Sequence, residues 1–190
     1  STGSSLIDSY HYSIPILRKN KDNHSFFRAT QLRHPLVEQI LDEEYIPQNI
    51  SLDDSLRGIL LFGVNSAGKS TLMKSIGISI LLAQIGFPVP AKKLEYYPYQ
   101  SIFTRISGND DILKGLSSFM VEMMELIAIL KRNDKNTLVL GDEICRGTEE
   151  KSANIIVTYM LEVLEKYNSS FITATHLHQI AEMDSVKKLK

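Results

Sequence analysis

Strand-like and helix-like patterns alternate along the chain from residue 58 onward. Short, almost continuous apolar runs at residues 59–62, 137–140 and 170–174 are typical of buried strands in a parallel sheet. Between them, apolar residues recur at helical spacing: Leu72, Met73, Ile76, Ile80, Leu81 and Ile85; Phe119, Met120, Met123, Met124, Ile127 and Leu130; Ile155, Ile156, Met160 and Leu164. This alternation predicts an α/β fold with a mainly parallel central sheet, in which ligands bind at the carboxyl ends of the strands.

Two of the predicted helices carry further expectations. The first is expected to be largely buried and to end at Gly86 and Pro88, because glycine favours the position after a helix and proline cannot continue one. In the second helix, the methionines are expected to fill the core, since methionine adapts to irregular gaps.

The first 57 residues show a weaker pattern. Apolar runs at residues 12–17 and 25–29 suggest strands, and helical spacing follows Pro35. Residues 94–107 suggest a further strand and a connecting loop. We therefore predict a single domain, with an N-terminal antiparallel β portion at about residues 1–57 and a core at residues 58–190.

The loop at residues 63–71, Gly-Val-Asn-Ser-Ala-Gly-Lys-Ser-Thr, has the full Walker A spacing of a phosphate-binding loop. Its glycines let the backbone fold around a phosphate, and the helix that follows adds positive potential at its N-terminus. Lys69 is expected to reach the β- and γ-phosphates, and the Ser70 hydroxyl to bind Mg²⁺. The predicted nucleotide-binding residues of this loop are Gly63, Asn65, Ser66, Ala67, Gly68, Lys69, Ser70 and Thr71. A solvated turn is the alternative.

Two further strand ends carry polar groups. The run at residues 137–140 leads into Asp142 and Glu143 and resembles a Walker B strand, which predicts Asp142 in the Mg²⁺ shell and Glu143 as the general base. His176, after the last run, is a candidate to stabilise the γ-phosphate. The alternatives are a solvated pair of carboxylates and a neutral histidine satisfied by backbone groups. Cys145 is a lone thiol, which is more often inert than nucleophilic.

Composition narrows the function further. The formal net charge is -1, whereas a domain that itself binds nucleic acid is usually strongly basic, so direct DNA contact by this chain is not expected. The single cysteine suits a reducing compartment, and no apolar run approaches the roughly 20 residues of a membrane span. An intracellular, soluble protein is expected, without a distinction between cytoplasm, nucleus and organelle.

The chain resembles the MutS family of mismatch-repair ATPases. Its motifs occur in that family's order: Arg33-His34-Pro35, the loop at residues 63–71, Phe103-Thr104-Arg105-Ile106, Asp110-Asp111, Ser117-Ser118-Phe119-Met120-Val121-Glu122-Met123, Asp142-Glu143-Ile144, Arg146-Gly147-Thr148 and Ala174-Thr175-His176. The resemblance extends over about residues 30–180. Departures are Val64 for the usual proline, Ala67 for glycine and Ser118 for threonine. The run at residues 145–149 suggests a divergent branch, organellar or viral.

The resemblance implies a P-loop domain of the ABC-ATPase type that binds ATP or ADP with Mg²⁺. Two copies, of the same or a related chain, are expected to enclose two nucleotides head to tail, with Ser117 of the facing copy completing each γ-phosphate site. Tyr45 and Ile46 match the position that packs on adenine, although a tyrosine over a core edge is equally consistent with the sequence. Mismatched DNA is then bound by other parts of a longer protein.

Other functions remain as alternatives. A transporter subunit of the same fold would carry a Leu-Ser-Gly-Gly-Gln signature, where this chain has Leu116-Ser117-Ser118-Phe119-Met120. The stronger alternative is a structural module that binds nucleotide with little or no turnover when isolated.

Overall fold

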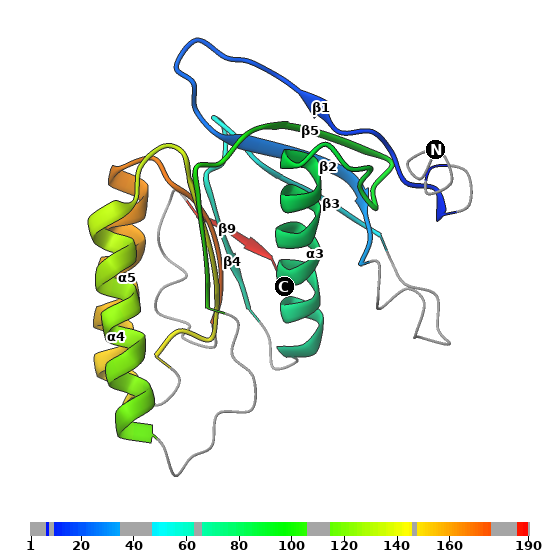
Figure 1. The fold of residues 1–190 in the computed structure, drawn as a ribbon. Helices are drawn as coiled ribbons and strands as arrows, with labels where there is room; N and C mark the ends of the chain where they lie inside the picture. Colours follow the sequence, from blue (N-terminus) through cyan, green and yellow to red (C-terminus); the bar gives the residue numbers. More distant parts are fainter. Residues whose placement is uncertain are drawn as a thin grey trace. The chain divides into compact units, whose positions relative to one another are not determined.

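The structure of the chain, a computed structural model, describes residues 7, 10–34, 47–62, 66–105, 115–145, 148–175 and 186–189 (Figure 1). For residues 66–67, 115–117 and 186–189 the description covers the backbone alone. The chain divides into two compact units, one formed by Ser1–Ser55 and Ala67–Tyr99, the other by Leu56–Ser66 and Gln100–Lys190.

The first unit contains a four-stranded sheet in the order β1-β5-β2-β3. Its strands are β1 (Ile16–Leu17), β2 (Phe26–Leu32), β3 (Gln48–Leu52) and β5 (Lys93–Tyr97). The central strand β2 is antiparallel to β3 and β5, and β1 is parallel to β5. The predicted antiparallel portion is therefore present, but it is not confined to residues 1–57. β5 joins it from almost 40 residues further along, because strand pairing does not follow sequence order.

Helix α3 (Ser66–Gln84) belongs, from Ala67 onward, to the same unit as this sheet. Its C-terminal turn is tied to the strand segment that follows, since Tyr96 Oη donates to Ala83 O (3.1 Å) and the Tyr99 N–H donates to Gln84 Oε1 (2.8 Å). The helix ends as predicted, with Gly86 in the left-handed region at φ +84°.

The expected burial of α3 holds for only part of its length. Met73, Ile76 and Ile80 are buried, whereas Leu81 and Ile85 are 54% and 67% exposed. The predicted apolar stripe is wider than the surface that the helix buries, so its flank faces solvent.

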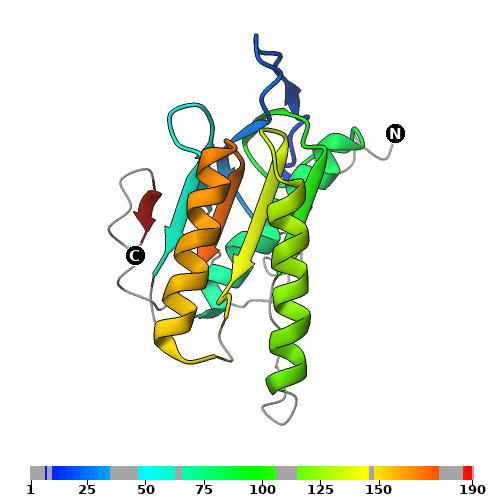
Figure 2. The same cartoon turned by 90° about the vertical axis from the view of Figure 1, so that its left-hand side faces the viewer.

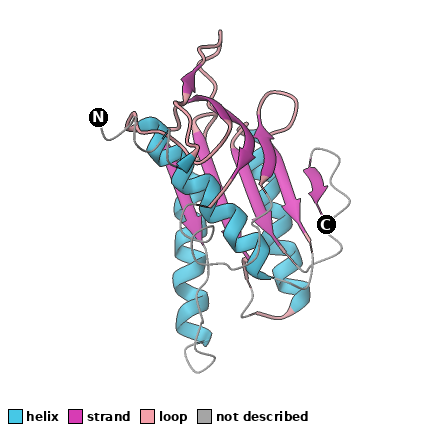
Figure 3. Ribbon diagram, turned by 90° about the vertical axis from the view of Figure 1, so that its right-hand side faces the viewer, coloured by secondary structure: helices cyan, strands magenta, loops and turns pink. Residues whose placement is uncertain are grey.

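The second unit is built on a five-stranded sheet in the order β6-β7-β8-β4-β9 (Figure 2). The strands are β4 (Gly58–Leu61), β6 (Ser101–Arg105), β7 (Thr137–Asp142), β8 (Ser170–Ala174) and β9 (Val186–Leu189). Every pair is parallel, and Figure 3 shows the strands side by side. β4, β7 and β8 are buried throughout, as their continuous apolar runs predict. The predicted mainly parallel central sheet is thus confirmed.

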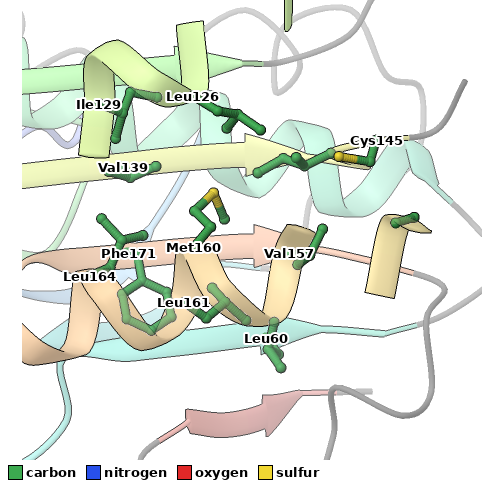
Figure 4. Close-up of a cluster of buried hydrophobic side chains, with 12 residues drawn as sticks. Leu60, Leu126, Ile129, Val139, Cys145, Val157, Met160, Leu161, Leu164 and Phe171 are labelled. Carbon is green, nitrogen blue, oxygen red and sulfur yellow. The ribbon is translucent and has the colours of Figure 1, made fainter. Parts of the chain in front are cut away.

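Helices α4 (Gly115–Arg132) and α5 (Glu150–Lys166) cover one face of this sheet (Figure 2). Their inner side chains form one apolar cluster with those of the strands (Figure 4). Its members are Leu60, Leu126, Ile129, Val139, Ile144, Cys145, Ala153, Val157, Met160, Leu161, Leu164 and Phe171. Each helix links two neighbouring parallel strands, β6 to β7 and β7 to β8, so the cluster fixes the strand ends that carry the polar motifs.

The structure corrects the prediction for the methionines of α4. Met120 and Met124 are 56% and 67% exposed, and only Met123 packs against the cluster. The buried face is carried instead by Glu122, Leu126 and Ile129. The predicted stripe is thus only partly correct: Met123 and Leu130 pack against the cluster, but its other flank is exposed, because the inner face of the helix includes a carboxylate.

Candidate functional site

The carboxyl end of the five-stranded sheet brings three strand ends into one hydrogen-bonded row. The parallel register pairs Leu61 of β4 with Ala174 of β8, and Ala174 with Asp142 of β7. The row continues by one residue, since the Glu143 N–H donates to Ala174 O (2.9 Å) and the Thr175 N–H donates to Leu61 O (3.0 Å). The strand before the glycine loop, the acidic pair and the last predicted strand therefore end side by side.

Asp142, the last residue of β7, is buried at this edge. Side chains alternate across a strand, so Asp142 faces away from Val139, which packs with α4 and α5. Its exposed fraction is only 4%. A buried carboxylate stays charged only where hydrogen bonds or a cation compensate for lost water. Because hard divalent cations prefer oxygen ligands, the chemistry of Asp142 fits a Mg²⁺ ligand.

Glu143 begins a tight loop after β7. It is half-buried, with φ +48°, and Cys145, two residues on, has φ +64°. Left-handed backbone costs a residue with a Cβ roughly 1 to 2 kcal/mol, so contacts around the loop must compensate. One is the bond from the Glu143 N–H to β8. Another is Ile144, whose side chain turns back into the apolar cluster. The direction of the Glu143 side chain thus depends on how this loop is held.

A carboxylate of α4 holds the far end of the same loop. Glu122 Oε1 accepts a hydrogen bond from the backbone N–H of Cys145, and Glu122 Oε2 lies 3.7 Å from Arg105 Nη2 at the end of β6. Sequence reasoning treated Glu122 and Arg105 only as parts of family motifs. The available signal was that Glu122 shares helical spacing with Leu126 and Ile129, which predicts a carboxylate on the buried face.

The Cys145 thiol is buried and 2% exposed. Burial raises its pKa to about 12, and the negative charge of Glu122 and a hydrogen bond with it act in the same direction. The thiolate is the reactive form of cysteine, so these surroundings favour the inert role over the nucleophilic one.

The predicted phosphate-binding residues that the structure describes open helix α3. Gly68, Lys69, Ser70 and Thr71 lie in its first two turns, and the backbone of residues 66 and 67 is helical as well. The first turn contains no acidic residue, although acidic groups are favoured there, and it carries the positive charge of Lys69. A cation in that place is opposed by the helix dipole, and a bound anion relieves the repulsion.

Ser117 lies in the first turn of α4 by its backbone. Five predicted site residues fall outside the described residues: Tyr45, Ile46, Gly63, Asn65 and His176. Their roles stay predictions.

No group of three or more histidine, cysteine, aspartate or glutamate side chains that suits a metal ion occurs in the described part of the chain. A protein site for Mg²⁺ in a nucleotide complex needs only one or two carboxylate or hydroxyl ligands, because water and phosphate oxygens supply the others. The Asp142 carboxylate and the Ser70 hydroxyl each offer the oxygen ligand that Mg²⁺ prefers. In the ranges that the structure describes, no helix is long and apolar enough to cross a membrane.

The chain, whose parallel sheet carries an acidic pair at its carboxyl edge, also matches a known protein family in sequence. Residues 59–190, more than half of the chain, match the family model described as MutS domain V. The chain therefore belongs to the MutS family.

Similar curated proteins come from three kinds of source. A mutS homologue named for DNA mismatch repair, from Acanthamoeba polyphaga mimivirus, is 42% identical over 99% of this chain and 20% of its own length. The mitochondrial DNA mismatch repair protein mutS homologue of Sarcophyton glaucum is 43% identical over 96% of this chain and 19% of its own length. DNA mismatch repair protein MutS of Bacillus subtilis is 34% identical, over 98% and 22%. The chain thus spans about a fifth of the length of these relatives.

Proposed function

We propose that the chain binds ATP with Mg²⁺ and hydrolyses it, as the ATPase domain of a DNA mismatch-repair protein. The observation that carries this proposal is the row of strand ends at the carboxyl edge of the sheet. In this row only β8 separates Asp142 and Glu143 from β4, the strand that leads into the glycine loop. Membership of the MutS family supports it, since the similar proteins are named for DNA mismatch repair.

The glycine loop and the start of α3 bind the phosphates in this proposal. Backbone N–H groups of Gly63, Asn65, Ser66, Ala67 and Gly68 surround them, with Thr71 in the turn that follows. Lys69 neutralises charge on the β- and γ-phosphates. Support comes from the first turn of α3, which carries that lysine and no acid.

Mg²⁺, when bound, neutralises negative charge that develops on the phosphate oxygens during transfer. Ser70 and Asp142 would hold it, in keeping with their oxygen ligands. Glu143 takes a proton from the water that attacks the γ-phosphorus, the bond to the bridging oxygen breaks, and ADP and phosphate are formed. His176 stabilises the γ-phosphate, and Tyr45 and Ile46 pack on the adenine.

The active unit in this proposal is a head-to-tail pair of ABC-type domains. Ser117 of each copy completes the site of the other, so ATP closes the pair and hydrolysis reopens it. DNA is bound by other parts of the full-length protein, in keeping with the net charge of -1 for this chain. We treat residues 1–190 as one ATPase domain, with an adenine-side portion at about residues 1–57 and a P-loop core at 58–190.

Glu143→Gln tests the catalytic assignment. The amide cannot act as a base, so ATP binding is expected to persist while hydrolysis falls at least about tenfold. Phosphate release and the affinity for ATP are measured on the same preparations. Normal turnover by the Glu143→Gln protein would contradict the assignment.

The alternative is a nucleotide-binding module with little turnover by itself. Measuring phosphate release at several protein concentrations distinguishes it from the ATPase. A composite site gives a rate of phosphate release per subunit that rises with protein concentration, because the pair must form first. ATP binding without phosphate release at any concentration would favour the module.

A further inference from the structure

Glu122 is a carboxylate on the inner face of a packing helix. It is 8% exposed, and it shares the buried face of α4 with Leu126 and Ile129, which belong to the apolar cluster. A charged group in such a place costs several kcal/mol unless hydrogen bonds and opposite charge compensate. The contacts of Glu122 must therefore provide this compensation.

The two carboxylate oxygens of Glu122 contact two different segments. Oε1 accepts from the backbone N–H of Cys145, and Oε2 lies 3.7 Å from Arg105 Nη2. Arg105 is shared with the exposed Glu125, whose Oε2 lies 3.2 Å from Arg105 Nη1. Glu122 thus joins α4 to the end of β6 and to the loop after β7, whereas Glu125 reaches the arginine alone.

The bond to Cys145 bears directly on Glu143. Glu143 and Cys145 are both left-handed, at φ +48° and +64°, and this backbone turns the Cys145 N–H toward α4. Because Cys145 is 2% exposed, its N–H has little access to water in the folded loop and depends on the carboxylate as its acceptor. An unsatisfied buried N–H costs about 1 to 3 kcal/mol, which is enough to favour another loop conformation.

We propose that Glu122 is a positioning residue for hydrolysis: its carboxylate holds the loop at residues 143–145 in the conformation that directs Glu143 toward the attacking water. This inference rests on the proposed function. It also has a consequence for the pair of domains. Ser117 opens the same helix and acts on the partner's nucleotide, while Glu143 acts on its own, so Glu122 links a helix of one site to the base of the other.

The test compares three single variants in the full-length protein. Glu122→Ala removes the acceptor, and turnover is expected to fall at least about tenfold, since a misplacement of about 1 Å can cost about a hundredfold. The affinity for ATP is expected to stay within about twofold, because Lys69 and the loop amides provide it. Glu122→Gln keeps an oxygen for the Cys145 N–H and is expected to recover turnover to within about threefold of wild type. Glu125→Ala, which only removes a surface contact to Arg105, is the control and is expected to match wild type.

Alkylation of Cys145 measures how accessible the loop at residues 143–145 is, and it requires no ATP. Iodoacetamide labelling, followed by mass spectrometry of the Cys145 peptide, is expected to be faster in Glu122→Ala than in wild type, and slower in Glu122→Gln than in Glu122→Ala, because glutamine removes the charge but keeps an acceptor for the Cys145 N–H.

Three results would overturn the role of Glu122: turnover in Glu122→Ala within twofold of wild type, equal losses of turnover and ATP affinity, or a Glu122→Gln protein as slow as Glu122→Ala. The second of these indicates a merely structural residue. An inactive wild-type protein, or an active Glu143→Gln protein, contradicts the proposed function itself, and the two failures are therefore told apart.

Discussion

The side chain of Ile144 occupies the space beside Gly141 that the Cβ of any other residue would need. A Cβ built on Gly141 overlaps Ile144 Cδ1 and lies 3.0 Å from Ile144 Cγ1. Gly141 precedes Asp142 in β7, and Ile144 is the residue at which the loop returns to the core. An alanine at this position would therefore force the Ile144 side chain to shift, whereas glycine leaves room for the loop to fold back against its own strand.

Gly141→Ala is expected to destabilise the protein by about 1 to 3 kcal/mol, the usual range for overpacking a core. The same substitution should cost clearly less in an Ile144→Ala background, because the overlapping atoms are gone. Urea unfolding of wild type, both single variants and the double variant measures the coupling. An equal penalty for Gly141→Ala in both backgrounds would show that the two side chains do not compete for this space.

Cys145 is expected to resist alkylation in the folded protein. Burial, together with the Glu122 carboxylate, raises its pKa to about 12, so hardly any thiolate is present at pH 8. Iodoacetamide should label it at least about a hundredfold more slowly than in urea. Because the pKa of the folded thiol lies above the unfolded value near 8.5, the unfolded state loses this proton first. The free energy of unfolding is therefore unaffected by this group below about pH 8.5 and falls as the pH rises toward 12. Equal labelling rates in the native and unfolded protein would contradict the burial of this thiol.

Asp53 is expected to contribute stability that acid removes. Burial raises its pKa, but hydrogen bonds from Ser55 and Arg28, with the positive charge of Arg28, lower it more, and the net pKa lies below its ordinary value. Arg28 Nε lies 2.8 Å from Asp53 Oδ2, and Ser55 Oγ lies 2.6 Å from Asp53 Oδ1. The contribution is therefore present above the unfolded pKa of about 4 and is lost as the pH falls through the folded pKa.

Asp53→Asn should accordingly lower the free energy of unfolding by about 0.5 to 1 kcal/mol at pH 7, a modest value because Arg28 is half exposed. The difference from wild type should shrink as the pH approaches 3, and urea unfolding across this range measures it. A difference that does not change with pH would rule out the ionised carboxylate as its source.

Ser117 is expected to act in trans, which mixing can reveal. Ser117→Ala and Glu143→Gln proteins should each hydrolyse ATP poorly, but each mixed pair has one site with both Ser117 and Glu143 intact. Since half of randomly formed pairs are mixed, the mixture should regain up to roughly a quarter of wild-type turnover. Phosphate release is followed as the two proteins are titrated together. A mixture no faster than the mean of its components would place Ser117 and Glu143 in the same copy's site.

Local pattern predicted the elements of the second unit well. The run at residues 170–174 matches β8 (Ser170–Ala174). In the first unit, the stop at Gly86 follows from the freedom of glycine to adopt positive φ. Strands buried on both faces give continuous apolar runs, and such runs are visible without tertiary information. The placement of Asp142 and Glu143 at a strand end follows from the same pattern.

The errors have a common physical cause. Met120 and Met124 are apolar but exposed, while Glu122 is charged but buried, because the side of α4 that faces the sheet is chosen by its neighbours. Likewise, β5 pairs with β2 over a long sequence separation, which no local pattern encodes.

The sequence by itself determined the alternation of strands and helices, the Walker spacings and the resemblance to the MutS family, since each is a property of residues close together along the chain. Only the tertiary structure decided that Leu61, Ala174 and Asp142 end in one row and that Glu122 holds the loop after β7. Those relations join segments far apart in sequence, and they exist only once the parallel sheet and its helices have packed.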